Sequence, residues 1–217
     1  MKYHYLDMSQ YKRKSHFEYF NSFSYPFMGV TVNVDITNLI AAVKKKHLPF
    51  FLSFCYCVAK SANCVPEFRQ RIINGRIAEY ENCSTSHTVA LEDQTYCYCT
   101  LDCRMPFQDY LPYAIREQEN SKVAKSTEDF IDDVNELIFI STLPWISYTA
   151  LVNPVSIPAD SNPRITWGKY FEQNARTLIP ISVLCNHALV DGVHLSQFYD
   201  FLNHQITELT DIINTML

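Results

Sequence analysis

Glycine is scarce in this chain, with four among 217 residues. These are Gly29, Gly75, Gly168 and Gly192, and they are widely separated. A phosphate-binding loop of the G-x-x-x-x-G-K-S type needs two glycines close together, so this count excludes it. No glycine pair flanks a serine in the G-x-S-x-G pattern of a nucleophile elbow, and this disfavours a serine hydrolase.

A surplus of basic residues and a long apolar run are also missing. The formal net charge is −5, and the only tight basic run is 44–46, so nucleic-acid binding is not expected. No apolar run reaches the roughly 18 residues that a membrane helix needs, and the start lacks the basic and apolar regions of a signal peptide. We therefore expect a soluble cytoplasmic protein without membrane contact.

The eight cysteines include no C-x-x-C pair. Their closest spacing is C-x-C, at 55–57 and 97–99, which is too tight for the usual zinc-binding patterns. The first pair lies in an apolar helical stretch, and the second alternates with tyrosines as in a strand. We therefore expect reduced and mostly buried thiols and no metal site.

Length and composition allow one sizeable core, so we expect a single domain over 1–217, with 47% hydrophobic residues to fill it. Strands are predicted at 3–6, 28–36, 87–91, 95–101, 136–141, 147–152, 164–171 and 178–185. Helices are predicted at 9–20, 37–46 with Thr37 as its cap, 50–62, 107–122 and 193–216. Asn74-Gly75 predicts a hairpin over 71–78, and the polar segment 122–133 is expected to be mobile. The mixture predicts an α/β fold, a two-layer sandwich with a large mixed β-sheet and helices packed on it.

The segment 187–192, His-Ala-Leu-Val-Asp-Gly, carries the strongest chemical signal. It joins the last predicted strand to the last predicted helix, a junction where open α/β sheets often hold reactive groups, and Gly192 permits a sharp reversal. His187 is a candidate general base because imidazole titrates near neutral pH. Two roles are open for Asp191: it either orients His187 or pairs with a distant arginine. A metal site of His187, Asp191 and His194 is disfavoured because these residues span a turn and not one helical face.

The string 186–194, Asn-His-Ala-Leu-Val-Asp-Gly-Val-His, resembles the H-x-x-x-D-G signature of the chloramphenicol acetyltransferases. Dihydrolipoyl acyltransferase cores and condensation domains share that motif. Further segments resemble those of the chloramphenicol acetyltransferases in the same order along nearly the whole chain. They are Arg-Lys-Ser-His-Phe-Glu at 13–18, Val-Asp-Ile-Thr at 34–37, Pro-Glu-Phe-Arg at 66–69, Ile-Ser-Thr-Leu-Pro-Trp at 140–145 and Ile-Thr-Trp-Gly-Lys-Tyr at 165–170.

The resemblance implies a coenzyme-A-dependent acyltransferase fold and direct transfer of acetyl from acetyl-CoA to an alcohol, with no metal. His187 would be the general base, Ser141 would donate a hydrogen bond to the tetrahedral oxyanion, and Thr166 would help hold that intermediate through a bound water. Asp191 would pair with Arg13, and together with Gly192 they would support the catalytic loop structurally.

The resemblance also implies a homotrimer with active sites between subunits and a small-molecule alcohol as acceptor. Tyr170 would lie against the adenine of the coenzyme. The residues expected to bind the acceptor are Tyr19, Phe20, Met28, Leu151 and Asn153. Leu151 stands where the family has an aromatic residue and Asn153 where it has a leucine, so one wall of the acceptor pocket is changed. Asn186 replaces a common histidine, a change that need not affect proton transfer.

Three functions follow from these observations. The leading hypothesis is O-acetylation of chloramphenicol, and hence antibiotic resistance. The second keeps the acetyl transfer and changes the acceptor to another hydroxyl compound, because of Leu151 and Asn153. The third is a trimeric binding protein without catalysis, and the presence of His187, Ser141 and Thr166 together argues against it.

Overall fold

A computed structural model describes residues 2–126 and 132–216 of the chain. Its helices are α1 (Lys14–Phe20), α2 (Thr37–Lys45), α3 (Phe50–Asn63), α4 (Phe107–Ala124) and α5 (Gly192–Thr215), with the short 3-10 helices η1 (Pro66–Arg69) and η2 (Val134–Glu136). Its strands are β1 (Tyr3–Tyr5), β2 (Phe27–Asp35), β3 (Gln70–Ile73), β4 (Arg76–Tyr80), β5 (Ser84–Ala90), β6 (Tyr96–Leu101), β7 (Leu137–Leu143), β8 (Arg164–Gly168), β9 (Phe171–Gln173) and β10 (Arg176–Asn186).

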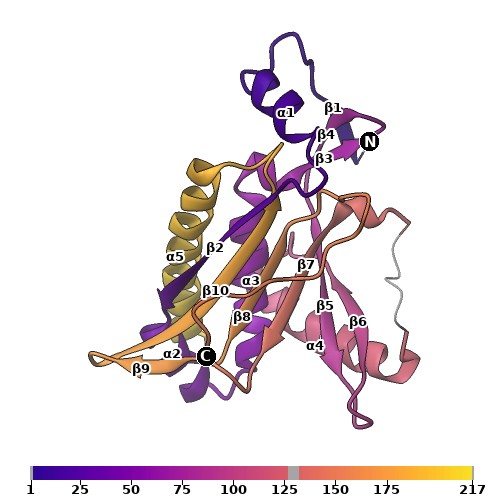
Figure 1. Ribbon diagram of the computed structural model, residues 1–217. Coiled ribbons are helices and arrows are strands. Elements are labelled where there is room, and N and C mark those ends of the chain that lie inside the picture. The colour runs from indigo at the N-terminus through magenta and orange to yellow at the C-terminus, as the bar shows by residue number, and fades with distance from the viewer. Residues whose placement is uncertain (1, 127–131, 217) are drawn as a thin grey trace.

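The strands form a large sheet and a small one. The large sheet has the order β2-β10-β8-β7-β5-β6, with β9 paired to β10. β5, β7 and β8 run parallel to one another, and the other pairings are antiparallel. The small sheet, β1-β4-β3, lies beside α1 at the end of the molecule that holds the N-terminus (Figure 1). The predicted α/β class, with a large mixed sheet and helices packed on it, is confirmed.

The two faces of the large sheet have different surroundings. Helices α2, α3, α4 and α5 gather on one side of it (Figure 1), where Trp167 of β8 packs against Phe51 and Phe54 of α3. Because side chains alternate along a strand, Thr166 projects to the opposite face. That face carries the polar side chains that matter for the site below.

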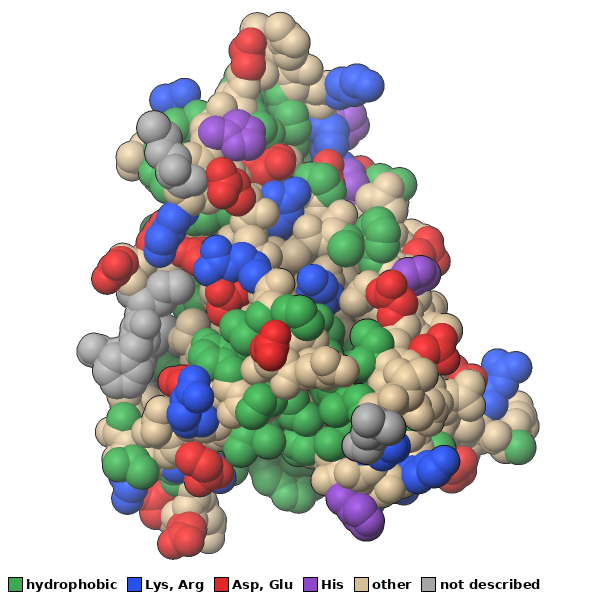
Figure 2. Space-filling view, turned by 180° about the vertical axis from the view of Figure 1, so that it is seen from behind, with side chains coloured by type: hydrophobic (Ala, Val, Ile, Leu, Met, Phe, Trp, Pro, Cys, Tyr) green, Lys and Arg blue, Asp and Glu red, His purple; other side chains and the backbone are tan. Residues whose placement is uncertain are grey.

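Seen from behind, acidic and basic side chains are interspersed over the surface, and hydrophobic side chains gather in its lower part (Figure 2). This side of the molecule has no broad area of one charge sign. None of the helices in the described ranges is long and apolar enough to cross a membrane.

Most predicted elements are confirmed within a few residues. Asn74 and Gly75 take positive φ angles of 52° and 72° in the predicted hairpin, as its turn requires. The helix predicted from residue 9 begins only at Lys14. Thr37 is not a cap, because its backbone and side chain both donate to the carboxylate of Asp35. Residues 127–131 of the segment predicted to be mobile lie outside the described residues.

The predicted strand at 147–152 is wrong. Both edges of β8 are already paired, with β7 and with β10, so this segment has no free strand edge beside it. It crosses the sheet face instead, where the Tyr148 hydroxyl donates to Thr166 O at 2.8 Å. A Cβ at Gly168 would lie 2.9 Å from the Tyr148 ring, so the glycine permits this close approach.

Candidate active site

His187 follows β10 directly, in the turn that leads to α5. Its Nδ1 lies 2.9 Å from Val190 O. A carbonyl only accepts hydrogen bonds, so Nδ1 carries the proton and Nε2 keeps its lone pair. The ring packs against Phe20 of α1, with centroids 3.9 Å apart and the ring planes tilted by 35°, and the backbone N–H donates to Pro26 O at 2.6 Å. This half-buried imidazole is therefore held in the tautomer that can accept a proton at Nε2.

Asp191 caps the start of α5. Its carboxylate accepts from Gly192 N at 2.7 Å and lies 3.5 Å from Arg13 Nη1. The hydrogen bond from Gly192 lowers the pKa of Asp191, although burial opposes the shift, and the charge of Arg13 adds to the lowering. The Nδ1–H of His187 donates its hydrogen bond to Val190 O and not to this carboxylate. The geometry thus matches the pairing of Asp191 with Arg13 and not a triad.

His194 is a part of this turn whose role the sequence did not reveal. Its Nδ1 accepts from Asp191 N at 2.9 Å, which closes a capping box at the start of α5. Its Nε2 lies 3.6 Å from Glu67 of η1. No group of three metal-binding side chains is found within residues 2–126 and 132–216.

Ser141 and Thr166 lie side by side on β7 and β8, as direct partners in the parallel register. Both line a cavity of about 940 Å³, here called the Ser141 cavity. The Ser141 hydroxyl has no hydrogen-bond partner within the described chain, whereas the Thr166 hydroxyl donates to Asn153 Oδ1 at 3.2 Å. Asn153 also lines this cavity, and its Nδ2 is buried without a partner in the described part of the chain.

The predicted acceptor-binding residues divide into two groups. Phe20 contacts His187, Tyr19 contacts Phe20 and is 61% exposed, and Met28 pairs with Cys185 of β10 in the sheet. Asn153 lies in the Ser141 cavity, whereas Leu151 does not line it.

One chain does not bring His187 together with Ser141 and Thr166. Thr166 pairs with Ser182 of β10, and His187 lies five residues further along the chain. At about 3.3 Å per residue, this places the histidine roughly 17 Å from Thr166. His187 is also not among the residues that line the Ser141 cavity. The two halves of the predicted site therefore face different parts of the surface.

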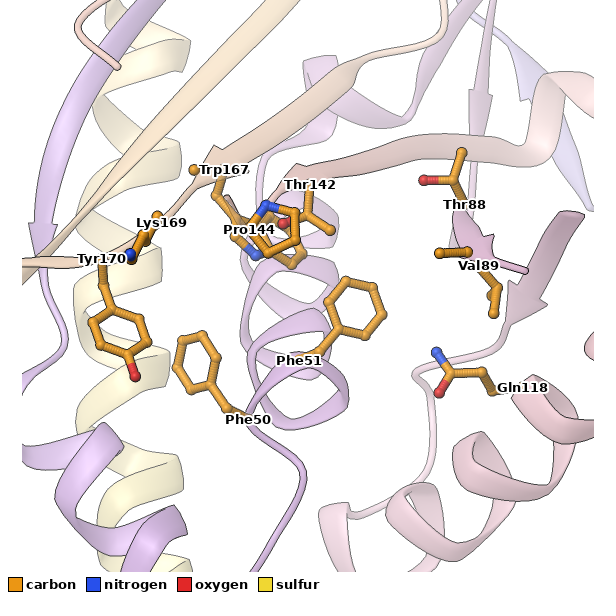
Figure 3. Close-up of a pocket in the computed structure, with 12 residues that line it drawn as sticks. Phe50, Phe51, Thr88, Val89, Gln118, Thr142, Pro144, Trp167, Lys169 and Tyr170 are labelled. Carbon is orange, nitrogen blue, oxygen red and sulfur yellow. The ribbon is translucent and has the colours of Figure 1, made fainter. Parts of the chain in front are cut away.

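A second cavity, of about 360 Å³, adjoins the first and is here called the Tyr170 cavity. Tyr170 and Lys169 lie at one end of it and Gln118 at the other, with Phe50 and Phe51 between them (Figure 3). Lys44 Nζ lies 5.7 Å from the centre of the Tyr170 ring. The two cavities share the lining residues Thr88, Ala90, Thr142 and Pro144. Lys169 was missed as a site residue, although it directly precedes Tyr170 in the motif at 165–170.

The cysteines take no part in either cavity. All eight are free, and Cys64 is exposed while the others are buried. Burial raises the pKa of Cys185 to about 12. These residues are the reduced and mostly buried thiols that the sequence predicts.

Comparison with known proteins places these features in a family. Residues 1–203 match the family model described as chloramphenicol acetyltransferase. Chloramphenicol acetyltransferases from Klebsiella and from Escherichia coli are each 28% identical to this chain over 208 residues, covering 94% of it and 93% of the relative. The enzyme of that name from Proteus mirabilis is 28% identical over 210 residues, with 94% of each chain covered.

Solved structures show the same fold. A chloramphenicol acetyltransferase structure superposes with a TM-score of 0.81 at 24% identity, covering 94% of this chain and 99% of the other. A probable dihydrolipoamide acetyltransferase from Listeria monocytogenes superposes with a TM-score of 0.68 at 12% identity, covering 94% and 93%.

Proposed function

Because the chain belongs to the chloramphenicol acetyltransferase family, we propose that it transfers an acetyl group from acetyl-CoA to a hydroxyl of chloramphenicol. The chain is an acyltransferase of this family. The transfer is direct, without an acyl-enzyme, and His187 is its general base. The observation that carries this proposal is the contact between His187 Nδ1 and Val190 O at 2.9 Å, which leaves Nε2 free to accept a proton.

The reaction needs one proton acceptor and one oxyanion donor. Nε2 of His187 takes the hydroxyl proton while the oxygen of the alcohol bonds to the thioester carbonyl carbon. When the carbon–sulfur bond breaks, the same proton passes to the leaving thiolate, and free coenzyme A results. Ser141 donates to the oxyanion of the tetrahedral intermediate, a contribution of roughly 3 kcal/mol for donors of this kind. The absence of a partner for the Ser141 hydroxyl within the described chain supports this role.

Two copies of the chain complete each site. In this proposal His187, Phe20 and Tyr19 come from one copy, and Ser141 and Thr166 come from the next. The separation of these groups within one chain supports the arrangement, because a single copy cannot bring them to one substrate. A homotrimer with its active sites between subunits would contain three such sites, each with His187 from one copy and Ser141 from the next.

Acetyl-CoA fits the Tyr170 cavity by its chemistry. Tyr170 offers an aromatic face to the adenine, and the ammonium groups of Lys169 and Lys44 lie near it, where they would attract phosphates. The residues that this cavity shares with the Ser141 cavity provide a path for the pantetheine arm. The thioester would then reach Ser141 while the nucleotide stays at Tyr170.

A second acceptor is favoured by the polar wall at Asn153. An apolar drug surface leaves the buried Nδ2 of Asn153 without a partner, whereas a more polar hydroxyl compound can bond to it. The second candidate function is therefore O-acetylation of such a compound by the same chemistry.

Mass spectrometry distinguishes these candidates. The purified protein is incubated with acetyl-CoA and chloramphenicol, and the mass gain of one acetyl group on the drug is measured beside a panel of polar alcohols. We expect acetylated chloramphenicol from the natural chain and none from His187→Ala. Acetylation of another alcohol alone would overturn the assigned acceptor, and transfer by His187→Ala at the natural rate would overturn the assigned base.

A further inference from the structure

Asn186 is the last residue of β10 and is 3% exposed. Both ends of its amide are bonded. Oδ1 accepts from Ala188 N at 3.0 Å, and Nδ2 donates to Asp160 O at 3.0 Å. A buried amide with both ends satisfied is held in one orientation.

The turn that Asn186 closes is the one that carries His187. The backbone carbonyl of Asn186 accepts from Leu189 N at 3.1 Å and from Val190 N at 3.0 Å. The same turn brings Val190 O to 2.9 Å from His187 Nδ1. The side chain and the backbone of one residue therefore fix both the imidazole and the carbonyl that selects its tautomer.

Asp160, whose backbone carbonyl accepts the hydrogen bond from Asn186, is itself held in place by other side chains. Its carboxylate accepts from Arg164 at 2.8 and 2.5 Å and from Ser156 at 2.6 Å. Burial alone would raise the pKa of Asp160, but the hydrogen bonds from Arg164 and Ser156 outweigh it and hold the pKa below its ordinary value. Arg164 lines the Ser141 cavity and lies two residues before Thr166 on β8. Asn186 thus fastens the turn of His187 to the strand that carries Thr166.

We propose that Asn186 is a positioning residue for His187. Its amide holds the turn so that Val190 O keeps the proton on Nδ1, and Nε2 stays available to the substrate. This inference rests on the proposed function, in which Nε2 accepts the proton of the acceptor alcohol. It also gives a role to the asparagine at this position, which the sequence alone indicates only as a change that need not affect proton transfer.

Two variants of Asn186 separate its contacts. Asn186→Ala removes both side-chain hydrogen bonds. Asn186→Ser keeps a short side-chain acceptor for Ala188 N without reaching Asp160, as serine does in related turns. The matched control is Asn162→Ala. Asn162 is also 3% exposed, and its amide donates to Val134 O and Leu137 O at 2.9 and 2.8 Å, away from His187.

The first measurement is steady-state acetylation of chloramphenicol with acetyl-CoA. We expect Asn186→Ala to lower kcat by about tenfold or more, a typical cost of misplacing a catalytic group, while KM for both substrates stays unchanged. Asn186→Ser should lose less, and Asn162→Ala should lower the thermal midpoint without changing kcat. Unchanged kcat in Asn186→Ala would overturn the proposal, and so would an equal fall in Asn162→Ala.

The second measurement needs no substrate. Nitrogen-15 NMR of the histidine rings reports which ring nitrogen carries the proton, and His187→Ala identifies the signals of His187. We expect one tautomer, protonated at Nδ1, in the natural chain and in Asn162→Ala, and a mixture in Asn186→Ala. The same tautomer in all of them would overturn the proposal. The expected mixture without any acetylation of chloramphenicol by the natural chain would support the positioning role and count against the proposed acceptor.

Discussion

The hydroxyl of Thr166 donates a hydrogen bond to Asn153 Oδ1 at 3.2 Å. A threonine hydroxyl has one proton, so this contact leaves only its lone pairs for other partners. In the Ser141 cavity Thr166 can accept a hydrogen bond from water or substrate, but it cannot also donate toward an oxyanion. Ser141, on the neighbouring strand, keeps its proton free for that purpose.

Removing either hydroxyl should therefore have unequal effects. Ser141→Ala should lower kcat by about a hundredfold, the usual cost of losing an oxyanion donor, with little change in KM. Thr166→Val keeps the shape of the threonine and should lower kcat only about threefold, by roughly 0.7 kcal/mol. Steady-state kinetics with chloramphenicol and acetyl-CoA measures both.

Ser182→Ala is the control for these two variants. Ser182 faces Thr166 across the sheet register, and its hydroxyl lies 2.6 Å from that of Thr31. Its loss should alter stability and leave kcat unchanged. An equal loss of kcat in Ser141→Ala and Thr166→Val would show that the Thr166 hydroxyl does not keep its hydrogen bond to Asn153 during the reaction.

Replacing Asn153 should improve the fit of an apolar acceptor. Its Nδ2 is buried without a partner in the described chain, a condition that costs about 1–3 kcal/mol. Asn153→Leu should therefore lower KM for chloramphenicol about fivefold. Asn162→Leu is the matched control, because the Nδ2 of Asn162 has two partners, Val134 O and Leu137 O, and its loss should leave KM unchanged. A higher KM in Asn153→Leu would mean that the amide binds the drug.

His87 should make the stability of the fold depend on pH. It is 1% exposed on β5, and burial lowers its pKa to about 4. The unfolded chain then takes up this proton near pH 6.5, before the folded chain does. His87 therefore leaves the free energy of unfolding unchanged above about pH 6.5. As the pH falls from 6.5 to about 4, its effect lowers the free energy of unfolding by about 3 kcal/mol.

Urea unfolding of the natural chain and of His87→Gln, at fixed protein concentration between pH 7 and pH 4.5, measures this dependence. The difference in the free energy of unfolding between the two should shift with pH in the direction stated. His204→Gln is the control, because the side chain of His204 is 66% exposed. A constant difference across this pH range would show that His87 does not stay neutral in the fold.

Much of this architecture could be predicted because local pattern and local structure agree. Asn74-Gly75 favours the positive φ angles of a hairpin turn independently of the surrounding structure. The apolar residues of 178–185 form a strand that leads directly to His187. The segment 147–152 could not be placed in this way. Its side chains suit a strand, but β8 has no free edge, and pairing partners distant in sequence decide that.

The residue types of the candidate site could be predicted from the sequence, but the hydrogen bonds between them could not. The motif at 187–192 identifies His187 and Asp191, and the structure places Arg13 beside the aspartate. Nothing in the pattern indicates that Val190 O fixes the imidazole or that Asn153 Oδ1 accepts a hydrogen bond from Thr166. Both contacts depend on turn geometry and on segments that meet only after folding.

The separation of His187 from Ser141 leads to a complementation prediction. His187→Ala and Ser141→Ala should each be nearly inactive when pure. If each site takes His187 from one copy and Ser141 from the next, assemblies that mix the two variants contain some sites with both residues intact. Unfolding the two variants together and refolding them should therefore restore activity, measured as acetylated chloramphenicol per total protein.

The control is a mixture of the two purified variants without unfolding, in which the subunits exchange only as fast as the assemblies dissociate. Refolding each variant alone should restore nothing. A double variant that carries both substitutions, refolded with the natural chain, still yields one intact pairing wherever two natural copies adjoin, and activity should follow that fraction. If co-refolded single variants stay inactive, while the natural chain regains its rate under the same treatment, His187 and Ser141 act within one chain, and the shared site is wrong.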